Sequence, residues 1–272
     1  MKRKKTLQVI LKKKLLGKSK VEYASGPGYY ALNLAEGCSH GCNFPCYEIK
    51  RRVVRFKTIK SYSEWIKPKI VGNTMALLNK ELQPKKFKGK VKTVFLCFAT
   101  DCFMYNQPEI RKLTFEVIKR VNKDNKCSMV LTKGTLPKAL ADKKKYGVNN
   151  KYGITLVFTD EKFRKKFEPG AAPLQARIRS LEYLHDQGLK TWVSIEPFLT
   201  PNLAEQDLNK ILDSIKFVDR IIFGRLNHNK AATQYLKSDP GYYRNCVKIV
   251  RKFCESPRSC RATTAADLSW DQ

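Results

Sequence analysis

Residues 37–47 of the chain read GCSHGCNFPCY, a stretch that places Cys38, Cys42 and Cys46 within nine positions. The stretch contains glycine and follows an apolar, strand-like run at residues 29–35. Three thiolates so close together can converge on one metal centre, since soft sulfur ligands select zinc, copper(I) or an iron–sulfur cluster. A structural zinc site needs a fourth ligand, for which His40 is the candidate, whereas three cysteines on a four-iron cluster leave one iron open for chemistry.

After this loop, apolar runs of strand length alternate with helical patterns. The expected strands cover residues 91–99, 127–132, 153–159, 189–196 and 218–224. The expected helices cover residues 108–122, 135–145, 173–187, 204–216 and 239–253, with a short one after Asp160 and an additional one at 73–82. Such an alternation predicts a parallel sheet covered by helices. With the run at 29–35 there are about six strands, too few for a closed eight-stranded barrel. We therefore expect an α/β fold, a partial (β/α) barrel of about six parallel strands, with its function at the carboxyl ends of the strands.

The domain organisation expected from these patterns has three parts. Residues 1–25 form a basic N-terminal arm, which over residues 1–20 carries no acidic residue and is expected to be mobile or weakly helical. Residues 26–230 form the partial barrel. Residues 231–272 form a helical extension that packs on the barrel.

The charge balance favours a polyanionic partner. The chain has 54 Lys and Arg against 24 Asp and Glu, a formal charge of +30, with 42% hydrophobic residues in 272. That hydrophobic share excludes a largely disordered chain, and the charge favours nucleic acid, DNA or RNA, over an anionic membrane. No apolar run has the length of a membrane span, and the basic start lacks the features of a secretory signal. We therefore expect a soluble, cytoplasmic protein whose nine cysteines do not form a disulfide framework.

Further motifs occur where the expected strands end. They are Ala99-Thr100-Asp101, Leu131-Thr132-Lys133, Thr155, and Glu168-Pro169-Gly170-Ala171-Ala172-Pro173 followed by Arg177. Together with the cysteine loop, these residues resemble the radical S-adenosylmethionine (SAM) enzymes, in particular the branch related to spore photoproduct lyase. The loop departs from the Cys-x3-Cys-x2-Cys spacing of that family, because one additional residue precedes Cys46.

The resemblance implies a [4Fe-4S] cluster on Cys38, Cys42 and Cys46, with SAM on the open iron. One electron, from a donor such as flavodoxin or ferredoxin, cleaves SAM to a 5′-deoxyadenosyl radical that abstracts hydrogen from the substrate. The implied SAM contacts are Thr100 or Asp101 to the amino or ribose groups, Lys133 and Arg177 to the carboxylate, Thr155 to the ribose, and Glu196 from the end of the fifth strand. Alternatives remain for three of them: Lys133 as a solvated lysine, Arg177 as the partner of Glu168, and Thr155 as an ordinary strand residue.

The catalytic candidates among the remaining residues are Cys97, Cys102 and Tyr105. Related families use a cysteine near the end of strand two as a hydrogen donor. Cys97 is offset by one position from that place, which Phe98 occupies, and the offset is expected to turn the Cys97 side chain to the other face. Buried structural thiols are the alternative for Cys97 and Cys102. Cys246, Cys254 and Cys260 are spaced too loosely for a metal hook, and a second cluster there is a minor alternative.

The functional hypothesis is a radical SAM enzyme that acts on nucleic acid, as a repair lyase or as a base-modifying enzyme. One alternative is a radical SAM enzyme that modifies a peptide or protein. Another is a noncatalytic nucleic-acid module in which Cys38, Cys42, Cys46 and His40 close a zinc site.

Overall fold

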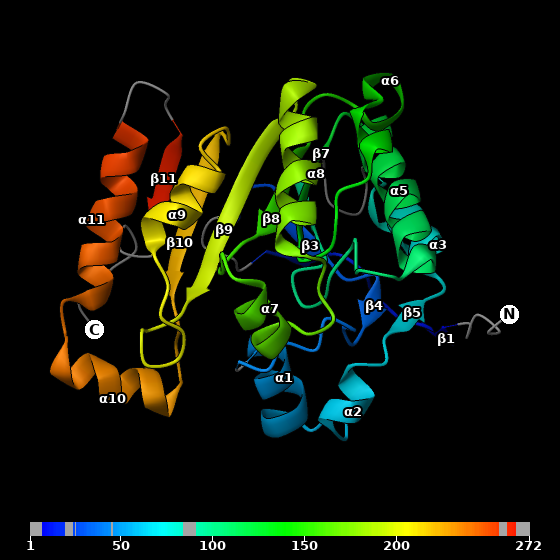
Figure 1. Cartoon of the computed structure of the whole chain (residues 1–272). Coiled ribbons are helices and arrows are strands. Elements are labelled where there is room, and N and C mark those ends of the chain that lie inside the picture. The colour runs from blue at the N-terminus through cyan, green and yellow to red at the C-terminus, as the bar shows by residue number, and fades with distance from the viewer. Residues whose placement is uncertain are drawn as a thin grey trace, which may run out of the picture.

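The structure is a computed structural model that describes residues 7–19, 24, 26–44, 46–83, 91–255 and 260–264. Within these residues the main sheet has the strand order β11-β10-β9-β8-β7-β6-β3-β2 (Figure 1). The six strands expected from the sequence are all present and mutually parallel: β3 (Tyr29–Leu32), β6 (Thr93–Leu96), β7 (Cys127–Thr132), β8 (Lys151–Thr155), β9 (Lys190–Phe198) and β10 (Arg220–Arg225). The α/β prediction of a partial barrel with about six parallel strands is confirmed for this part of the chain.

The helices that cover the sheet are α5 (Pro108–Lys123), α8 (Leu174–Asp186), α9 (Leu208–Ser214) and α11 (Tyr242–Glu255) (Figure 1). Helix α5 shows why they form, since Pro108 begins it and Ile110, Val117 and Val121 recur at helical spacing on its buried face. The helix expected at 73–82 is α3 (Thr74–Glu81), and the short helix after Asp160 is α7 (Glu161–Phe167).

The helix expected at 135–145 is divided into two short pieces, η3 (Lys138–Ala141) and α6 (Lys143–Tyr146). The division occurs at Asp142, whose side chain accepts a hydrogen bond from the Lys145 amide and so caps the second piece. A residue that caps one helix has non-helical backbone angles and ends the helix before it.

The N-terminal segment is structured where it is described. Strand β1 (Gln8–Ile10) pairs in parallel with β5 (Lys69–Val71), and β5 pairs with β4 (Ala35–Glu36) to form a second, small sheet. Strand β2 (Gly17–Lys18) extends the main sheet antiparallel to β3. The prediction of a mobile or weakly helical arm is therefore wrong for these strands. Residues 1–6, 20–23 and 25 of the arm lie outside the described residues.

The C-terminal extension contains more than helices. The helix expected at 239–253 is α11, but α10 (Lys230–Ser238) precedes it and β11 (Arg261–Thr264) adds a parallel strand beside β10. Cys254 and Cys260 form a disulfide, while Cys246 is buried and free. One such bond is not a disulfide framework, and it engages two of the three cysteines on which the alternative of a second cluster depended. Residues 265–272 lie outside the described part of the chain.

Two hydrophobic layers hold the sheet in place. The larger core lies between the sheet and its helices, and a smaller one, made of Phe95, Met129, Trp192 and Ile222 with Ala24, lies inside the partial barrel. Two of its members, Phe95 and Ile222, also line the cavity described below. Among the helices described, none is both long enough and apolar enough to cross a membrane.

Candidate active site at the carboxyl ends of the strands

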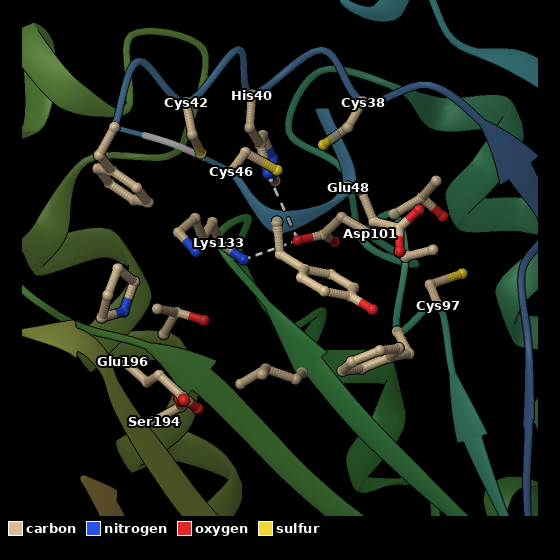
Figure 2. A pocket seen from close by; sticks show the side chains of 18 of the residues that line it. Cys38, His40, Cys42, Cys46, Glu48, Cys97, Asp101, Lys133, Ser194 and Glu196 are labelled. Carbon is tan, nitrogen blue, oxygen red and sulfur yellow. Dashed lines mark hydrogen bonds and ion pairs between the residues drawn. The ribbon is translucent and has the colours of Figure 1, made fainter. Parts of the chain in front are cut away.

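A cavity of about 550 Å³ lies at the carboxyl ends of β6 to β10. Figure 2 shows the cysteine loop on one side of it and the end of β9, with Ser194 and Glu196, on the opposite side. This volume is in the range of pockets that enclose a cofactor or a small ligand. The polar and thiol side chains along its wall include Cys38, Cys42, Cys46, Thr100, Asp101, Lys133, Thr155, Ser194, Glu196 and Arg225.

The cysteine loop is fixed by backbone contacts to distant segments. The Cys38 amide donates to the Trp65 carbonyl at 2.8 Å, and the Asn43 amide donates to the Phe167 carbonyl at 2.8 Å. The Gly170 amide donates to the His40 carbonyl at 2.9 Å. A Cβ atom on Gly170 would lie 2.0 Å from the Ser39 carbonyl oxygen, so only glycine permits this approach.

The three loop cysteines are free thiols that line the cavity. Burial raises the pKa of Cys38 well above its ordinary value, and nearby Asp101 adds to the effect. Burial also raises the pKa of Cys42. Both groups are therefore protonated thiols in the protein without metal, and metal binding must release their protons.

His40 lines the cavity beside the loop cysteines, and protein groups engage both of its ring nitrogens (Figure 2). Its Nε2 accepts a hydrogen bond from the Tyr105 amide at 2.9 Å, so the ring proton is on Nδ1, which lies 3.4 Å from Oδ2 of Asp101. Burial, and after it the charge of Arg177, lowers the pKa of His40 well below the ordinary value and keeps the ring neutral.

The zinc alternative required His40 as the fourth ligand, and both of its ring nitrogens are engaged elsewhere. Moreover, no three His, Cys, Asp or Glu side chains of the described residues converge on a single metal ion. In this arrangement His40 is therefore not available as the fourth ligand of a closed zinc site. A four-iron cluster is larger than one ion and requires its thiolates to lie further apart.

Asp101, in the segment after β6, connects that segment to the end of β7. Its carboxylate accepts from the Thr132 hydroxyl at 2.7 Å and from the Phe103 and Lys133 amides at 2.9 and 2.8 Å. Burial raises the pKa of Asp101 to about 6, although these hydrogen bonds oppose the shift. Because protein donors already engage both carboxylate oxygens, the observed role of Asp101 is to position the loop and the strand ends.

Arg177 forms a buried ion pair with Glu168, with 2.7 Å between Nη1 and Oε2, and both side chains are fully buried. Its guanidinium also donates to the Ala172 and Thr155 carbonyls at 2.9 and 3.1 Å. Arg177 is not among the described residues that line the cavity. The structure thus corrects its placement as a SAM contact and shows the pairing with Glu168 that was the alternative.

Lys133 does line the cavity, with its Nζ 3.7 Å from Oε1 of Glu168. Burial opposes the charged ammonium, but the neighbouring carboxylate of Glu168 favours it, and the pKa of Lys133 is raised overall. Lys133 is therefore a cation at the wall of the cavity, beside the cysteine loop.

The remaining predicted contacts also lie at the cavity. Thr100 and Thr155 line it, and the Thr100 hydroxyl is buried without a hydrogen-bond partner among the described residues. Glu196 reaches it from β9, beside Gly224, where a Cβ would lie 2.6 Å from Glu196 Oε1. A buried hydroxyl without a partner indicates that a ligand atom completes the site.

Of the three catalytic candidates, only Cys97 is among the described residues that line the cavity. Strand β6 ends at Leu96, and Cys97 has a left-handed φ of +60°, so strand alternation does not apply to it and both Cys97 and Phe98 line the cavity. Cys97 is 3% exposed and also belongs to the larger core together with Cys102, so the expected direction of its side chain stays a prediction. Cys102 is fully buried, and neither Cys102 nor Tyr105 is among the described residues that line the cavity.

The sequence pattern of the radical SAM superfamily matches residues 32–215, more than half of the chain. This chain is a member of the radical SAM superfamily. It is 25% identical over 247 residues to the uncharacterized protein ORF301 of Acidianus two-tailed virus, covering 82% of this chain and 78% of that one. It is 24% identical to the uncharacterized protein MJ0683 of Methanocaldococcus jannaschii, covering 82% and 80% of the two chains.

Solved structures of other radical SAM proteins share the fold. Spore photoproduct lyase complexed with dinucleoside spore photoproduct superposes with a TM-score of 0.68 at 14% identity, covering 95% of this chain and 82% of that one. SuiB of Streptococcus suis bound to S-adenosylmethionine gives a TM-score of 0.52 at 12% identity, covering 86% and 46%. The cofactors of this radical SAM enzyme are a [4Fe-4S] cluster and SAM.

The site of this radical SAM enzyme fits these cofactors. The loop supplies three thiols and no fourth protein ligand, since His40 is engaged with Asp101 and Tyr105. Three thiolates leave one iron without a protein ligand, which is what a cluster that binds SAM requires. The cavity beside the loop provides Lys133 and the Thr100 hydroxyl for the polar groups of SAM.

Sequence reasoning missed several polar residues of the site, among them Glu48, Lys50 and Ser194, which line the cavity. Ser194 lies two positions before Glu196, so strand alternation could have placed both on one face. Glu48 is followed by Arg51 and Arg52 at helical spacing, a pattern typical of a carboxylate held by two ion pairs.

Proposed function

We propose that this radical SAM enzyme holds its cluster on Cys38, Cys42 and Cys46 and acts on nucleic acid, as a repair lyase or a base-modifying enzyme. The observation that carries the cluster assignment is the position of three free thiols on one fixed loop at the cavity wall. The cation Lys133 lies beside the same loop.

When bound at this site, the cluster and SAM would supply radical chemistry, and the residues of the chain would hold and orient them. Lys133 binds the carboxylate of SAM, since a cation at the wall provides the charge-assisted hydrogen bonds that a carboxylate needs. Thr100, Thr155 and Ser194 provide short polar groups for the amino and ribose positions. The chain positions its cofactors and excludes water, while the cofactors provide the chemistry.

The apolar part of the wall has a separate task. Phe95, Phe98 and Ile222 line the cavity together with the polar residues. These side chains offer no hydrogen bonds to water, so they limit solvent at the place where a radical must react only with the substrate.

Three observations support a nucleic-acid substrate. The chain carries a formal charge of +30, and at the cavity Lys50 comes from the cysteine-loop side while Arg225 comes from the end of β10. Cations on both sides of a cavity suit a polyphosphate backbone that crosses it. The structurally similar spore photoproduct lyase is complexed with a dinucleoside spore photoproduct.

The test is an anaerobic assay of the reconstituted protein with SAM and a chemical reductant, followed by one with flavodoxin. We expect iron binding and formation of 5′-deoxyadenosine, increased by DNA or RNA and abolished in the Cys38→Ala/Cys42→Ala/Cys46→Ala variant. The matched control is Cys127→Ala, because Cys127 is a free, partly exposed thiol that is not among the cavity-lining residues described.

The outcomes separate the two halves of the proposal. Iron binding that survives in the triple variant would contradict the cluster assignment. Product formation increased by peptides, with no response to nucleic acid, would favour the peptide- or protein-modifying alternative. Affinity for oligonucleotides should fall steeply with salt, because each phosphate contact releases a counterion.

A further inference from the structure

An alternating row of aromatic and cationic side chains extends from the cavity onto the surface. It comprises Phe98, Tyr47, Arg51, Phe56 and Arg55, and we name it the aromatic–cationic ladder. The Tyr47 and Phe98 rings are 6.2 Å apart between centroids, and both residues line the cavity. The Arg51 guanidinium lies 6.0 Å from the Tyr47 ring and 5.9 Å from the Phe56 ring, and that of Arg55 lies 5.3 Å from the Phe56 ring.

The aromatic rings of the ladder are exposed, although rings of this size are usually buried. Tyr47 is 62% exposed, Phe56 54% and Phe98 42%. Val54, in the same segment, is 64% exposed. An exposed apolar cluster of this kind marks a surface that binds another molecule.

The ladder is held in a fixed arrangement by its backbone and by one buried carboxylate. Tyr47 begins α1 (Tyr47–Ile49), which continues as the π-helix η2 (Lys50–Arg55). The Phe56 amide donates to the Arg51 carbonyl at 2.9 Å, which closes a π-helical turn, a rare conformation that is frequent at functional sites.

The carboxylate is Glu48, which is 3% exposed and accepts two hydrogen bonds from Arg51, at 2.9 and 3.0 Å. This fork fixes the Arg51 guanidinium between the two rings before any ligand binds. Preorganised groups of this kind bind more tightly, because less side-chain freedom is lost on binding.

The positive charge of residues 50–57 favours an anionic partner. Lys50, Arg55 and Lys57 are exposed, and no acidic side chain of the described residues forms an ion pair with them. Single-stranded nucleic acid binds to surfaces where bases stack on aromatic rings while phosphates contact cations. A base pair in a duplex hides its faces by stacking, so it cannot use such rings.

We infer that the ladder binds an unpaired stretch of the nucleic-acid substrate and guides one nucleotide into the cavity. This inference rests on the proposed function, because it names the part of the substrate that the same site recognises. It predicts that single-stranded or unpaired segments bind better than a regular duplex.

The experiment measures the fluorescence anisotropy of a fluorescein-labelled, mixed-sequence single-stranded DNA, its RNA equivalent and the matching duplex. In Phe56→Ala we expect the affinity for single strands to fall by about 5- to 100-fold, the range for losing one stacked base. The affinity for the duplex should change far less. Phe56→Trp should restore single-strand binding, since it replaces the ring.

The matched control is Tyr183→Ala. Tyr183 carries a similar cation–π contact, 4.9 Å from Lys138, but neither residue is among the described residues at the cavity. Normal circular dichroism and thermal unfolding of Phe56→Ala would show that the fold is intact.

Three results would overturn the inference, and they differ in what they leave standing. If the wild-type protein binds oligonucleotides but Phe56→Ala behaves like Tyr183→Ala, the ladder is not the binding surface and the proposed function stands. If the wild-type protein binds no oligonucleotide, the nucleic-acid proposal itself fails. If Phe56→Ala instead loses binding to phosphatidylserine-containing vesicles and leaves oligonucleotide binding unchanged, the ladder binds membranes.

Discussion

Gly170 lies where the segment after α7 meets the cysteine loop, and its missing side chain makes that contact possible. In Gly170→Ala the new methyl group would lie 2.0 Å from the Ser39 carbonyl oxygen, so the loop must move. We expect the free energy of unfolding to fall by about 1–3 kcal/mol and the iron content after reconstitution to fall with it. Both are measured by thermal unfolding and iron analysis. Gly17→Ala is the control, since no atom lies within 4 Å of its added Cβ, and equal behaviour of the two variants would contradict the argument.

A second prediction concerns Arg177, which can act either as a member of a buried ion pair or as a contact to SAM. The two roles predict different effects of its substitution. Removing one member of a buried ion pair leaves an unpaired charge, so Arg177→Met should lower the free energy of unfolding by about 3–5 kcal/mol. The double variant Glu168→Leu/Arg177→Met should regain much of this loss. Lys133→Met, at the cavity wall, should instead weaken SAM binding with a smaller change in stability. Chemical denaturation measures the loss of stability, and equilibrium dialysis with SAM measures the loss of binding. An Arg177→Met variant that is stable but does not bind SAM would show that Arg177 contributes to SAM binding.

Strand geometry alone decides the position of some site residues, and these could be predicted from the sequence. Polar residues after parallel strands meet at one edge of a sheet, which brings Thr100, Lys133 and Thr155 to the same cavity. Arg177 also follows a recognisable motif, but its side chain does not reach the cavity. It is buried in an ion pair with Glu168, which strand geometry does not predict. Strand alternation does not decide the position of Cys97, because its backbone leaves the strand at a positive φ.

At the scale of elements, Glu81 of α3 attaches the N-terminal segment to the barrel. Its buried carboxylate accepts the Leu15 and Leu16 amides at 3.0 and 2.7 Å. Glu81→Ala leaves these amides without partners, so we expect a loss of about 1–3 kcal/mol and faster hydrogen exchange at both positions. Glu182→Ala, at an exposed position of α8, is the control. Unchanged exchange at Leu15 and Leu16 would show that Glu81 does not hold the segment.

This attachment explains why the elements near the N-terminus were not predicted. The six long strands are continuous apolar runs, and such runs predict buried parallel strands from sequence alone. By contrast, β1, β4 and β5 are two or three residues long and pair across large separations in sequence. The many lysines of residues 1–20 indicate a solvated arm, and no local pattern identifies Glu81 as the partner of this segment.

At the scale of the whole molecule, the Cys254–Cys260 disulfide connects α11 to the edge strand β11. A bond that closes a short loop restricts the unfolded chain modestly, so its reduction should lower the stability of the cluster-free protein by about 2 kcal/mol. We expect reductant to lower the melting temperature of the wild type. The melting temperature of Cys254→Ser/Cys260→Ser should be the same with and without reductant. In denaturant without reductant, seven of the nine cysteines should react with a thiol reagent, all of them lying in the described part of the chain. Nine reactive thiols would contradict the bond.

The contacts of the cysteine loop also set an order of events during synthesis. The loop at residues 38–46 is near the start of the chain, yet it is fixed by the carbonyl of Phe167 and the amide of Gly170. Domains begin to fold on the ribosome as they emerge, and contacts between distant residues form last. A nascent chain that exposes its cysteines therefore has no finished loop until residue 170 has been translated. If the loop holds the cluster as proposed, iron delivered earlier would meet three unconstrained thiols, and the cluster would be inserted only after about the first two thirds of the protein have been translated.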